Sequence, residues 1–372
     1  MIVLKYPLVS ALILNFNGKE KLADILTRCV SSVLNSDYSN LEVIFFDNGS
    51  TDDSIEFVKK EIQTSAKLRI IAISRNRGPV TGLNKAMEYA RGKYTVLLNN
   101  DVEVEPDSIR KLVDAMESDS TIGIAQSKIL FFDRLHIQSA GNMLDLTLTA
   151  RLIGYAEEAE GEYESVIETT FAHGACMILR KSMIERIGLF DPDYFFYHDD
   201  VDFSLRARLA GFKVVCVPTS IVYHKGGGTI SDSFMRHADW HYSLNSRIGL
   251  LIKNLEFTSI LKIGIPVFMN NILIMYGLVV HGNSILALKS AAWFFKSLRN
   301  NLRLRQVVQN RIRKIPDEDL FEHFLDYSIW LLHLKWTRPL CWIAKPKDSL
   351  GESISRVLDV YYHDHKAGTQ MR

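Results

Sequence analysis

The chain has 372 residues, 44 lysines and arginines against 43 aspartates and glutamates, and 47% hydrophobic residues. This length fits two structural units, and the ordinary apolar fraction excludes a chain that is disordered throughout. Its four cysteines stand far apart, so we expect neither a disulfide framework nor a cysteine-based zinc site, and a reducing compartment such as the cytoplasm. The apolar residues 1–14 include Lys5 and Pro7 and lack a small-residue cleavage site, which favours a first strand over a signal peptide.

Charge is unevenly distributed along the chain. Residues 1–256 hold 28 basic and 34 acidic side chains, whereas residues 257–316 hold nine basic and no acidic ones. This shift predicts a boundary near residue 256 between an N-terminal domain and a region formed by residues 257–372. A basic, apolar stretch suits an anionic membrane surface or nucleic acid. No nucleic-acid-binding motif accompanies it, so we do not expect nucleic acid as a partner.

Strand and helix patterns alternate through the first third of the chain. Near-continuous apolar runs predict buried parallel strands, and helical periodicity predicts the helices between them. This order implies an α/β fold with a mostly parallel sheet and right-handed crossovers, which binds its ligands at the carboxyl ends of the strands. The expected strands are residues 8–15, 41–46, 68–74 and 94–98, and the expected helices are residues 19–34, 52–62, 81–90 and 106–116.

Polar residues follow three of these strands. Residues 47–52 (DNGSTD) either form a turn that caps the next helix, or place Asp47 where it accepts hydrogen bonds from a nucleoside. Residues 75–79 (RNRGP) match neither GxGxxG nor a P-loop, and either open a helix or hold an anion at its N-terminus. A carboxylate after a buried strand, as at Asp101, is a turn residue or a ligand for Mg²⁺ or Mn²⁺.

Three carboxylates crowd together further along the chain. Asp199, Asp200 and Asp202 follow an aromatic run and begin a helix expected over residues 201–210. N-capping accounts for one aspartate but not for three, so we expect a raised pKa or a nearby metal ion. His224 follows further short strands, expected over residues 214–217 and 221–223, and precedes three glycines that would let the backbone approach a ligand.

Together these residues resemble the nucleotide-sugar glycosyltransferases of family two, above all the rhamnosyl- and galactofuranosyl-transferase-like branch. The matching stretches follow the family's order over residues 8–230. They are NFNGKEKLADILTRCVSSVLN, DNGSTDDS, SRNRGPVTGLNKAM, YTVLLNNDVEVEPDSI, GNMLD, AHGACMILRKSMIERIGLFDPDYFFYHDDVDFSLRARLAGF and YHKGGGT.

The resemblance implies a GT-A nucleotide-diphospho-sugar transferase fold, Rossmann-like, with a helical C-terminal region. It implies inverting transfer, with Asp200 as general base and Asp199 contacting acceptor hydroxyls or orienting that base. Asp101 matches the carboxylate that binds Mg²⁺ or Mn²⁺ on the donor diphosphate, and His224 matches a histidine that completes the ion's ligands. The positions that match donor-binding residues are Asn15, Asp47, Asp52, Asn76, Gly78, Asn84 and Asn100.

The resemblance also implies a UDP- or dTDP-linked sugar as donor and a glycan or lipid-linked glycan as acceptor. One departure from the family pattern matters, because Asn99-Asn100-Asp101 contains one carboxylate where the family signature has two. Asparagine is a poorer partner for Mg²⁺ than aspartate. A non-catalytic protein of the same fold that binds nucleotide sugars or glycans is therefore the alternative.

The C-terminal region is apolar and basic. Residues 260–280 are interrupted by Lys262, Pro266 and the adjacent amides Asn270 and Asn271, and residues 285–295 are followed by basic residues. Three arrangements remain open: helices in the interface of an anionic membrane, one membrane span, or a buried subdomain that could join two copies of the chain. Aromatic residues over 320–342 could pack on these helices. We expect a peripheral protein on the inner face of the cell membrane.

Overall fold

We analysed a computed structural model of the protein, which describes residues 6–62, 65–159, 163–194, 197–226, 246–280, 282 and 284–325. Phe195 and Phe196 of the aromatic run, two of the three glycines that follow His224, and most of the aromatic stretch over 320–342 lie outside the described residues.

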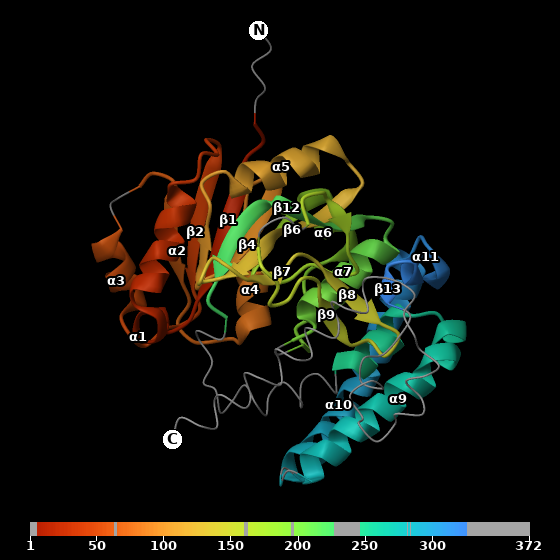
Figure 1. The fold of residues 1–372 in the computed structure, drawn as a ribbon. Coiled ribbons are helices and arrows are strands. Elements are labelled where there is room, and N and C mark those ends of the chain that lie inside the picture. Colours follow the sequence, from red (N-terminus) through yellow and green to blue (C-terminus); the bar gives the residue numbers. More distant parts are fainter. Residues whose placement is uncertain are drawn as a thin grey trace.

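A mixed sheet forms the centre of the molecule (Figure 1). Its order is β10-β12-β6-β11-β4-β1-β2-β3, with β5 paired to β12 and β7 to β6. β1 to β4 are parallel neighbours, whereas β11 runs antiparallel between β4 and β6. The strands are β1 (Val9–Asn15), β2 (Leu41–Asp47), β3 (Leu68–Ala72), β4 (Tyr94–Asn99), β5 (Val102–Val104), β6 (Ile122–Phe131), β7 (Ile137–Ser139), β10 (Ile167–Glu168), β11 (Cys176–Arg180) and β12 (Lys213–His224).

Helices cover both faces of this sheet, which explains why its strands are apolar on both sides. Val9, Ala11 and Ile13 of β1 face one core, and Leu12 faces the other. The first core is closed by α2, α3 and α5, and the second by α4, α6 and α7. The helices are α1 (Gly18–Leu22), α2 (Asp24–Leu34), α3 (Ser54–Glu61), α4 (Pro79–Met87), α5 (Ser108–Ser118), α6 (Lys181–Ile187) and α7 (Asp199–Leu209).

Two expected elements differ from the structure. The single helix predicted over residues 19–34 is wrong, because Ala23 has a φ of 46° and separates α1 from α2. The Ala23 N–H instead bonds back to the carbonyls of Gly18 and Lys19. The separate strands expected over 214–217 and 221–223 form one strand, β12, with a register shift between Val217 and Ile221.

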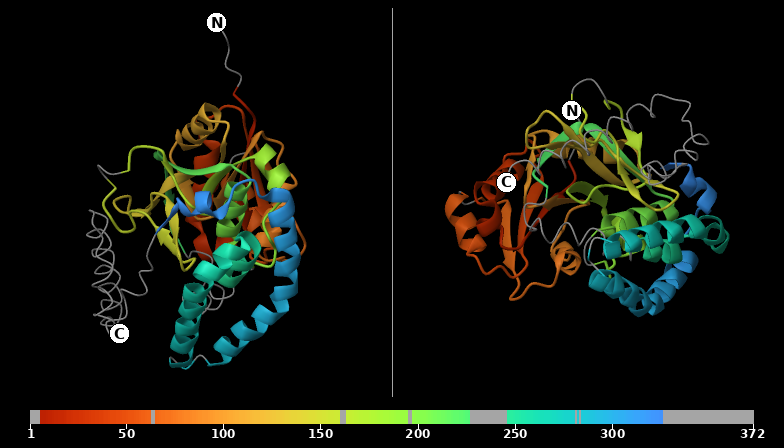
Figure 2. Two further views of the ribbon diagram at one scale, coloured as in Figure 1. Left: turned by 90° about the vertical axis from the view of Figure 1, so that its right-hand side faces the viewer. Right: turned by 60° about the horizontal axis from the view of Figure 1, so that its bottom comes forward.

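The described residues from 257 to 325 form a helical hairpin that extends beyond the sheet and then returns to the body (Figure 2). Its strand β13 pairs in parallel with β8, at Phe324 and Leu144, in a small second sheet. Hydrogen bonds join residues 1–256 to the residues that follow them. A domain boundary near residue 256 therefore stays a prediction. The elements are β8 (Asn142–Asp145), β9 (Ala150–Leu152), α9 (Phe257–Val280), α10 (Ser284–Val307), η1 (Val308–Ile312), α11 (Asp317–Phe321) and β13 (Phe324–Leu325).

Candidate active site

The carboxyl ends of three neighbouring strands bring a chain of polar side chains together. Asn15 ends β1 beside Asp47 at the end of β2, and Asn100 follows β4. Asn15 Nδ2 donates to Asp47 Oδ1 at 2.8 Å, and Asn100 Nδ2 donates to Asn15 Oδ1 at 2.9 Å. All three side chains are buried. Asn100 and Asn15 therefore fix the orientation of the Asp47 carboxylate.

The loop after β2 is folded against the loop after β3. Asp47 accepts hydrogen bonds from the Ser50 N–H at 2.9 Å and from Ser50 Oγ at 2.5 Å. Gly49 has a φ of 79°, and a Cβ at this position would lie 2.4 Å from the backbone of Arg75. Only glycine fits this close approach.

The loop after β3 forms the entry to α4. Asn76 Oδ1 accepts from the Gly78 N–H at 2.7 Å and from Asn48 Nδ2 at 3.1 Å. Asn48 Nδ2 also donates to the Gly78 carbonyl at 3.0 Å. Arg75 and Arg77 are exposed beside this turn. Asn76 and Gly78 thus lie next to the Asp47 loop, as expected of a shared donor site.

Two of the predicted donor residues form hydrogen bonds that stabilise the fold. Asp52 accepts from Ser54 Oγ at 2.5 Å and from the Glu20 N–H at 2.8 Å, which joins α1 to the start of α3. Asn84 Nδ2 donates to the Phe190 carbonyl at 2.8 Å, and its Oδ1 accepts from the Phe190 N–H at 3.1 Å. Donor contacts by Asp52 and Asn84 remain predictions.

Asp101 and His224 form the pair that could hold a divalent ion. His224 Nε2 lies 3.3 Å from Asp101 Oδ1, and both side chains are buried. His224 Nδ1 lies 2.7 Å from Gln138 Oε1, a pure acceptor, so Nδ1 must donate. Nε2 of a neutral imidazole then presents its lone pair to the carboxylate. A cation could bind between these two atoms.

The separation of this pair suits a hard divalent cation. Neighbouring ligands on one Mg²⁺ ion, each at about 2 Å, lie about 3 Å apart. Within the described part of the chain, no group of three or more His, Cys, Asp or Glu residues could hold a metal ion. Mg²⁺ commonly takes one or two carboxylates and completes its ligands with substrate phosphates and water. Asp101 and His224 therefore fit an ion that is bound jointly with a diphosphate.

A short bridge connects this pair to Asp200 at the start of α7. The ring of His173 lies edge-on to that of His224, with centroids 5.9 Å apart. The next residue, Gly174, donates its N–H to Asp200 Oδ2 at 3.0 Å, and the Val201 N–H donates to Asp200 Oδ1 at 2.8 Å. His173 and Gly174 thus connect the Asp101–His224 pair to Asp200.

Asp199 and Asp200 have different electrostatic surroundings. Burial raises the pKa of both carboxyl groups. Repulsion from Asp200 raises the pKa of Asp199 further, whereas backbone N–H groups of Gly174 and Val201 oppose the rise at Asp200. Asp200 is therefore the more readily ionised member of the pair, and it can accept a proton near neutral pH.

Asp202, the third carboxylate of the cluster, is structural. It is fully buried, with Arg206 Nε at 2.9 Å from Oδ2 and Lys253 Nζ at 3.0 Å from Oδ1. Burial alone would raise its pKa, but Lys253 and Arg206 outweigh this effect and hold the pKa of Asp202 at about 2. Of the three aspartates that crowd together in the sequence, Asp199 and Asp200 are therefore the candidates for a functional role, and Asp202 belongs to a buried ion pair.

Two residues at the site were not predicted from the sequence. Gln138 orients His224, and Ser50 anchors Asp47. Ser50 follows Asp47 by three residues, a spacing typical of side-chain turns. Gln138 and His224 are 86 residues apart and share no local pattern.

A cavity of about 690 Å³ lies elsewhere, between residues 187–193 and α10. Lys253, Trp293 and Lys296 are among its lining residues, and none of Asp47, Asp101, Asp200 or His224 is. The candidate site is therefore defined by its contacts and not by this cavity.

Comparison with known proteins finds similar glycosyltransferases. Residues 10–188 match the model of Glycosyl transferase family 2. An uncharacterised glycosyltransferase of Haemophilus influenzae is 26% identical over 193 residues, which cover 52% of this chain and 71% of that protein.

Two solved structures are similar in fold. A mannosyltransferase from Pyrobaculum calidifontis, in complex with GDP-Man and Mn²⁺, has a TM-score of 0.51 and 17% identity over 82% of this chain and 85% of its own. GalNAc-T7 with UDP, GalNAc and Mn²⁺ has a TM-score of 0.51 and 16% identity over 67% of this chain, which spans 48% of that protein. This chain thus has the GT-A fold, and its residues 10–188 are similar to Glycosyl transferase family 2.

Proposed function

We propose that this protein transfers a sugar from a nucleoside diphosphate sugar to an acceptor hydroxyl, with inversion at the anomeric carbon. One observation carries the proposal: hydrogen bonds link Asp47 to Asn15 and Asn15 to Asn100, and His173 with its neighbour Gly174 links the Asp101–His224 pair to Asp200. Since Asn100 directly precedes Asp101, the two series meet at the end of β4. Donor, leaving group and acceptor would share one edge of the sheet.

In this mechanism Asp200 acts as the general base. Its carboxylate takes the proton of the acceptor hydroxyl as the oxygen forms a bond to the anomeric carbon. The bond from that carbon to the diphosphate breaks, and its electron pair leaves with the diphosphate. Asp101 and His224 would hold Mg²⁺ or Mn²⁺, which supplies positive charge for the leaving group when bound. Attack opposite the leaving group inverts the anomeric configuration.

The remaining substrate assignments are also proposals. Asp47, fixed by Asn15 and Ser50, would accept a hydrogen bond from the nucleoside of a UDP- or dTDP-linked donor. Asp199, adjacent to the base, would contact the hydroxyls of a glycan or lipid-linked glycan acceptor. The proposed branch makes rhamnose and galactofuranose the first donor sugars to test, and the GDP-Man bound by one structural neighbour adds guanine nucleotides to the panel.

The test compares Asp200→Asn with the wild type. Melting temperature is measured with a panel of UDP-, dTDP- and GDP-sugars, with and without Mn²⁺, and turnover is measured with the donor that stabilises the protein. We expect Asp200→Asn to keep the donor-induced stabilisation and to lose turnover by about 10²–10⁴-fold. Asp114→Asn, an exposed aspartate on α5, is the matched control. Near-normal turnover in Asp200→Asn would overturn the assignment of the base.

Asn99 favours one alternative, a protein that binds nucleotide sugars without turnover. It is exposed at the site, and its Nδ2 lies 3.4 Å from His224 Nε2, where a carboxylate would have strengthened an ion site. This alternative predicts that donors raise the melting temperature of the wild type equally with Mn²⁺ and with a chelator, and that no sugar is transferred or hydrolysed. Metal-dependent turnover would exclude it.

A further inference from the structure

Helix α9 exposes a continuous apolar stripe along its whole length. The stripe consists of large side chains spaced three or four residues apart, so they share one face of the helix. Ile265, near its middle, is 72% exposed. Soluble proteins rarely expose apolar patches of this extent without a partner. The stripe residues are Phe257, Leu261, Ile265, Phe268, Ile272, Tyr276 and Val279.

The opposite face of α9 is packed against protein. Ile263 and Val267 join the core that contains α7, and Ile274 and Leu278 pack with Ala287 of α10. Asn270, near the helix midpoint, is buried, and its Nδ2 lies 3.3 Å from Thr149 Oγ1 in the turn after β8. The stripe is therefore the outward face of a helix whose inner face is already occupied.

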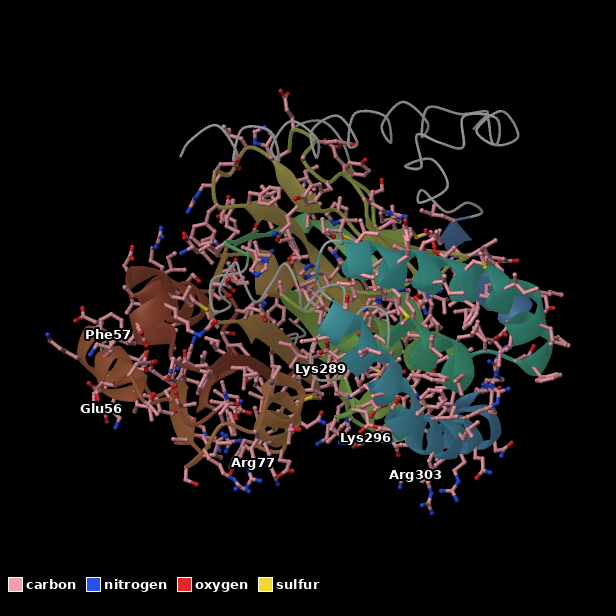
Figure 3. All side chains as sticks on the ribbon, turned by 90° about the horizontal axis from the view of Figure 1, so that it is seen from below. Glu56, Phe57, Arg77, Lys289, Lys296 and Arg303 are labelled. Carbon is pink, nitrogen blue, oxygen red and sulfur yellow. The ribbon has the colours of Figure 1, made fainter. Side chains whose placement is uncertain are left out.

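Helix α10 carries a row of positive charge. Lys289, Lys296 and Arg303 are exposed, recur every seven residues and follow one another along α10 (Figure 3). Exposed Leu288, Phe295 and Leu302 directly precede them in the sequence and form a parallel apolar row. No acidic residue occurs between 257 and 316.

We propose that the α9–α10 hairpin binds an anionic lipid bilayer and lies in its interface. The apolar stripe of α9 and the apolar row of α10 would enter the acyl boundary, and the basic row would contact lipid phosphates. Apolar rows flanked by lysine and arginine are the features that bind such surfaces. This inference goes beyond sugar transfer, because lipid binding can be measured without any substrate.

The contacts of α9 favour interfacial binding over a membrane span. By length and composition, α9 could cross a membrane, and it is the single helix of the described residues for which this holds. A spanning α9 would bring Asn270, and with it the turn at Thr149, to the bilayer centre. That turn lies beside buried Asp145, which pairs with Arg151 at 3.1 Å. Placing this polar turn in hydrocarbon is costly.

Charge repulsion disfavours a second copy of the chain as the partner that covers the α9–α10 hairpin. A two-fold dimer brings the same surface of both copies together. Through this hairpin it would oppose two rows of lysine and arginine with no acid between residues 257 and 316 to compensate. Like charges brought together across an interface weaken association.

Vesicle sedimentation of the full chain tests the proposal. We expect binding to vesicles with about one-third phosphatidylglycerol and little binding to pure phosphatidylcholine. Lys289→Glu, Lys296→Glu and Arg303→Glu together should weaken binding by about a hundredfold or more. Leu261→Gln, Ile265→Gln and Phe268→Gln together should also weaken vesicle binding, because they remove apolar side chains that would enter the acyl boundary. These three side chains are exposed, so their replacement should leave the fold intact.

The matched control reverses three exposed lysines of the N-terminal part, Lys59→Glu, Lys60→Glu and Lys181→Glu, and should bind like the wild type. An equal loss of vesicle binding in this control would show that binding depends only on the net charge of the protein, and would overturn the proposal. Bound protein that resists extraction by alkaline carbonate would indicate a span and would also overturn it. So would a dimer in sedimentation velocity that the Leu261, Ile265 and Phe268 variant converts to a monomer.

Discussion

At the scale of single residues, neighbouring carboxylates of the same chemical type differ because of what each one faces. Asp200 accepts two backbone N–H groups, Asp199 experiences the charge of Asp200, and Asp202 pairs with Lys253 and Arg206. The sequence shows three aspartates within four positions. Their roles depend on partners that are distant in the chain.

The raised pKa of Asp200 predicts the pH dependence of catalysis. A general base must be ionised, so kcat/KM should fall as the pH drops through the raised pKa, and this acidic limb should lie above the ordinary aspartate pKa of about 4. Asp199 has the higher pKa of the two, so it is still protonated where Asp200 ionises, and Asp199→Asn should leave the position of this limb nearly unchanged. The measurement is the pH profile of kcat/KM for both proteins. A limb that moves to lower pH in Asp199→Asn would show instead that Asp199 carries a negative charge over this range.

Gln138 predicts a second effect at this scale, on metal affinity. By accepting from Nδ1, Gln138 keeps Nε2 of His224 directed at Asp101. Residues that orient a metal-binding histidine commonly contribute 10–100-fold in affinity. Gln138→Leu should therefore raise the Mn²⁺ concentration that half-activates transfer by about 10–100-fold, measured by Mn²⁺ titration at saturating donor. Gln306→Leu, an exposed glutamine on α10, should leave the titration unchanged.

At the scale of elements, a buried cation fixes α7 to the helical residues 246–254. Lys253 Nζ contacts both Asp202 on α7 and Asp191 in the loop before it. Asn254 Nδ2 adds a hydrogen bond of 3.0 Å to Asp202. The position of Asp200 at the start of α7 therefore depends on contacts at residue 253.

Lys253→Met should destabilise the fold by about 3–5 kcal/mol, because it leaves buried carboxylates without their cation. Urea denaturation at neutral pH measures this difference. Asp202 has a lowered pKa, so its contribution is complete above its unfolded pKa near 4 and disappears as the pH falls towards 2. The difference between the proteins should shrink over that range. Lys60→Met, an exposed lysine, should change stability by less than about 0.5 kcal/mol.

At the scale of the whole molecule, the two regions of contrasting charge are interlocked. The Glu256 N–H donates to Asp317 Oδ2 at 2.7 Å, and the Lys314 N–H donates to the Leu209 carbonyl at 2.6 Å. Residues 1–256 alone should therefore expose apolar surface at α7. We expect this fragment to aggregate, or to bind a hydrophobic dye more strongly than the full chain does. A soluble fragment that melts cooperatively would show instead that residue 256 is a true domain boundary.

The sheet was predictable from sequence because its buried strands are apolar runs that end in polar residues. That pattern placed Asp47 and Asp101 at strand ends, where the structure has them. The local sequence pattern could not predict the break between α1 and α2, because the residue with positive φ at this break is Ala23 and not a glycine. Nor could it distinguish Asn84, which bonds the Phe190 backbone, from Asn76 beside the Asp47 loop. Such distinctions depend on residues that are brought together only by folding.

The return of the chain to β8 through β13 fixes the helical hairpin at both ends. One end follows Glu256, and the other is joined to the sheet at Phe324 and Leu144. A hairpin held at both ends keeps a constant tilt relative to the strands. On the proposed bilayer surface Asp200 would therefore be held at one height and in one direction, and the proposed acceptor would approach it from one side.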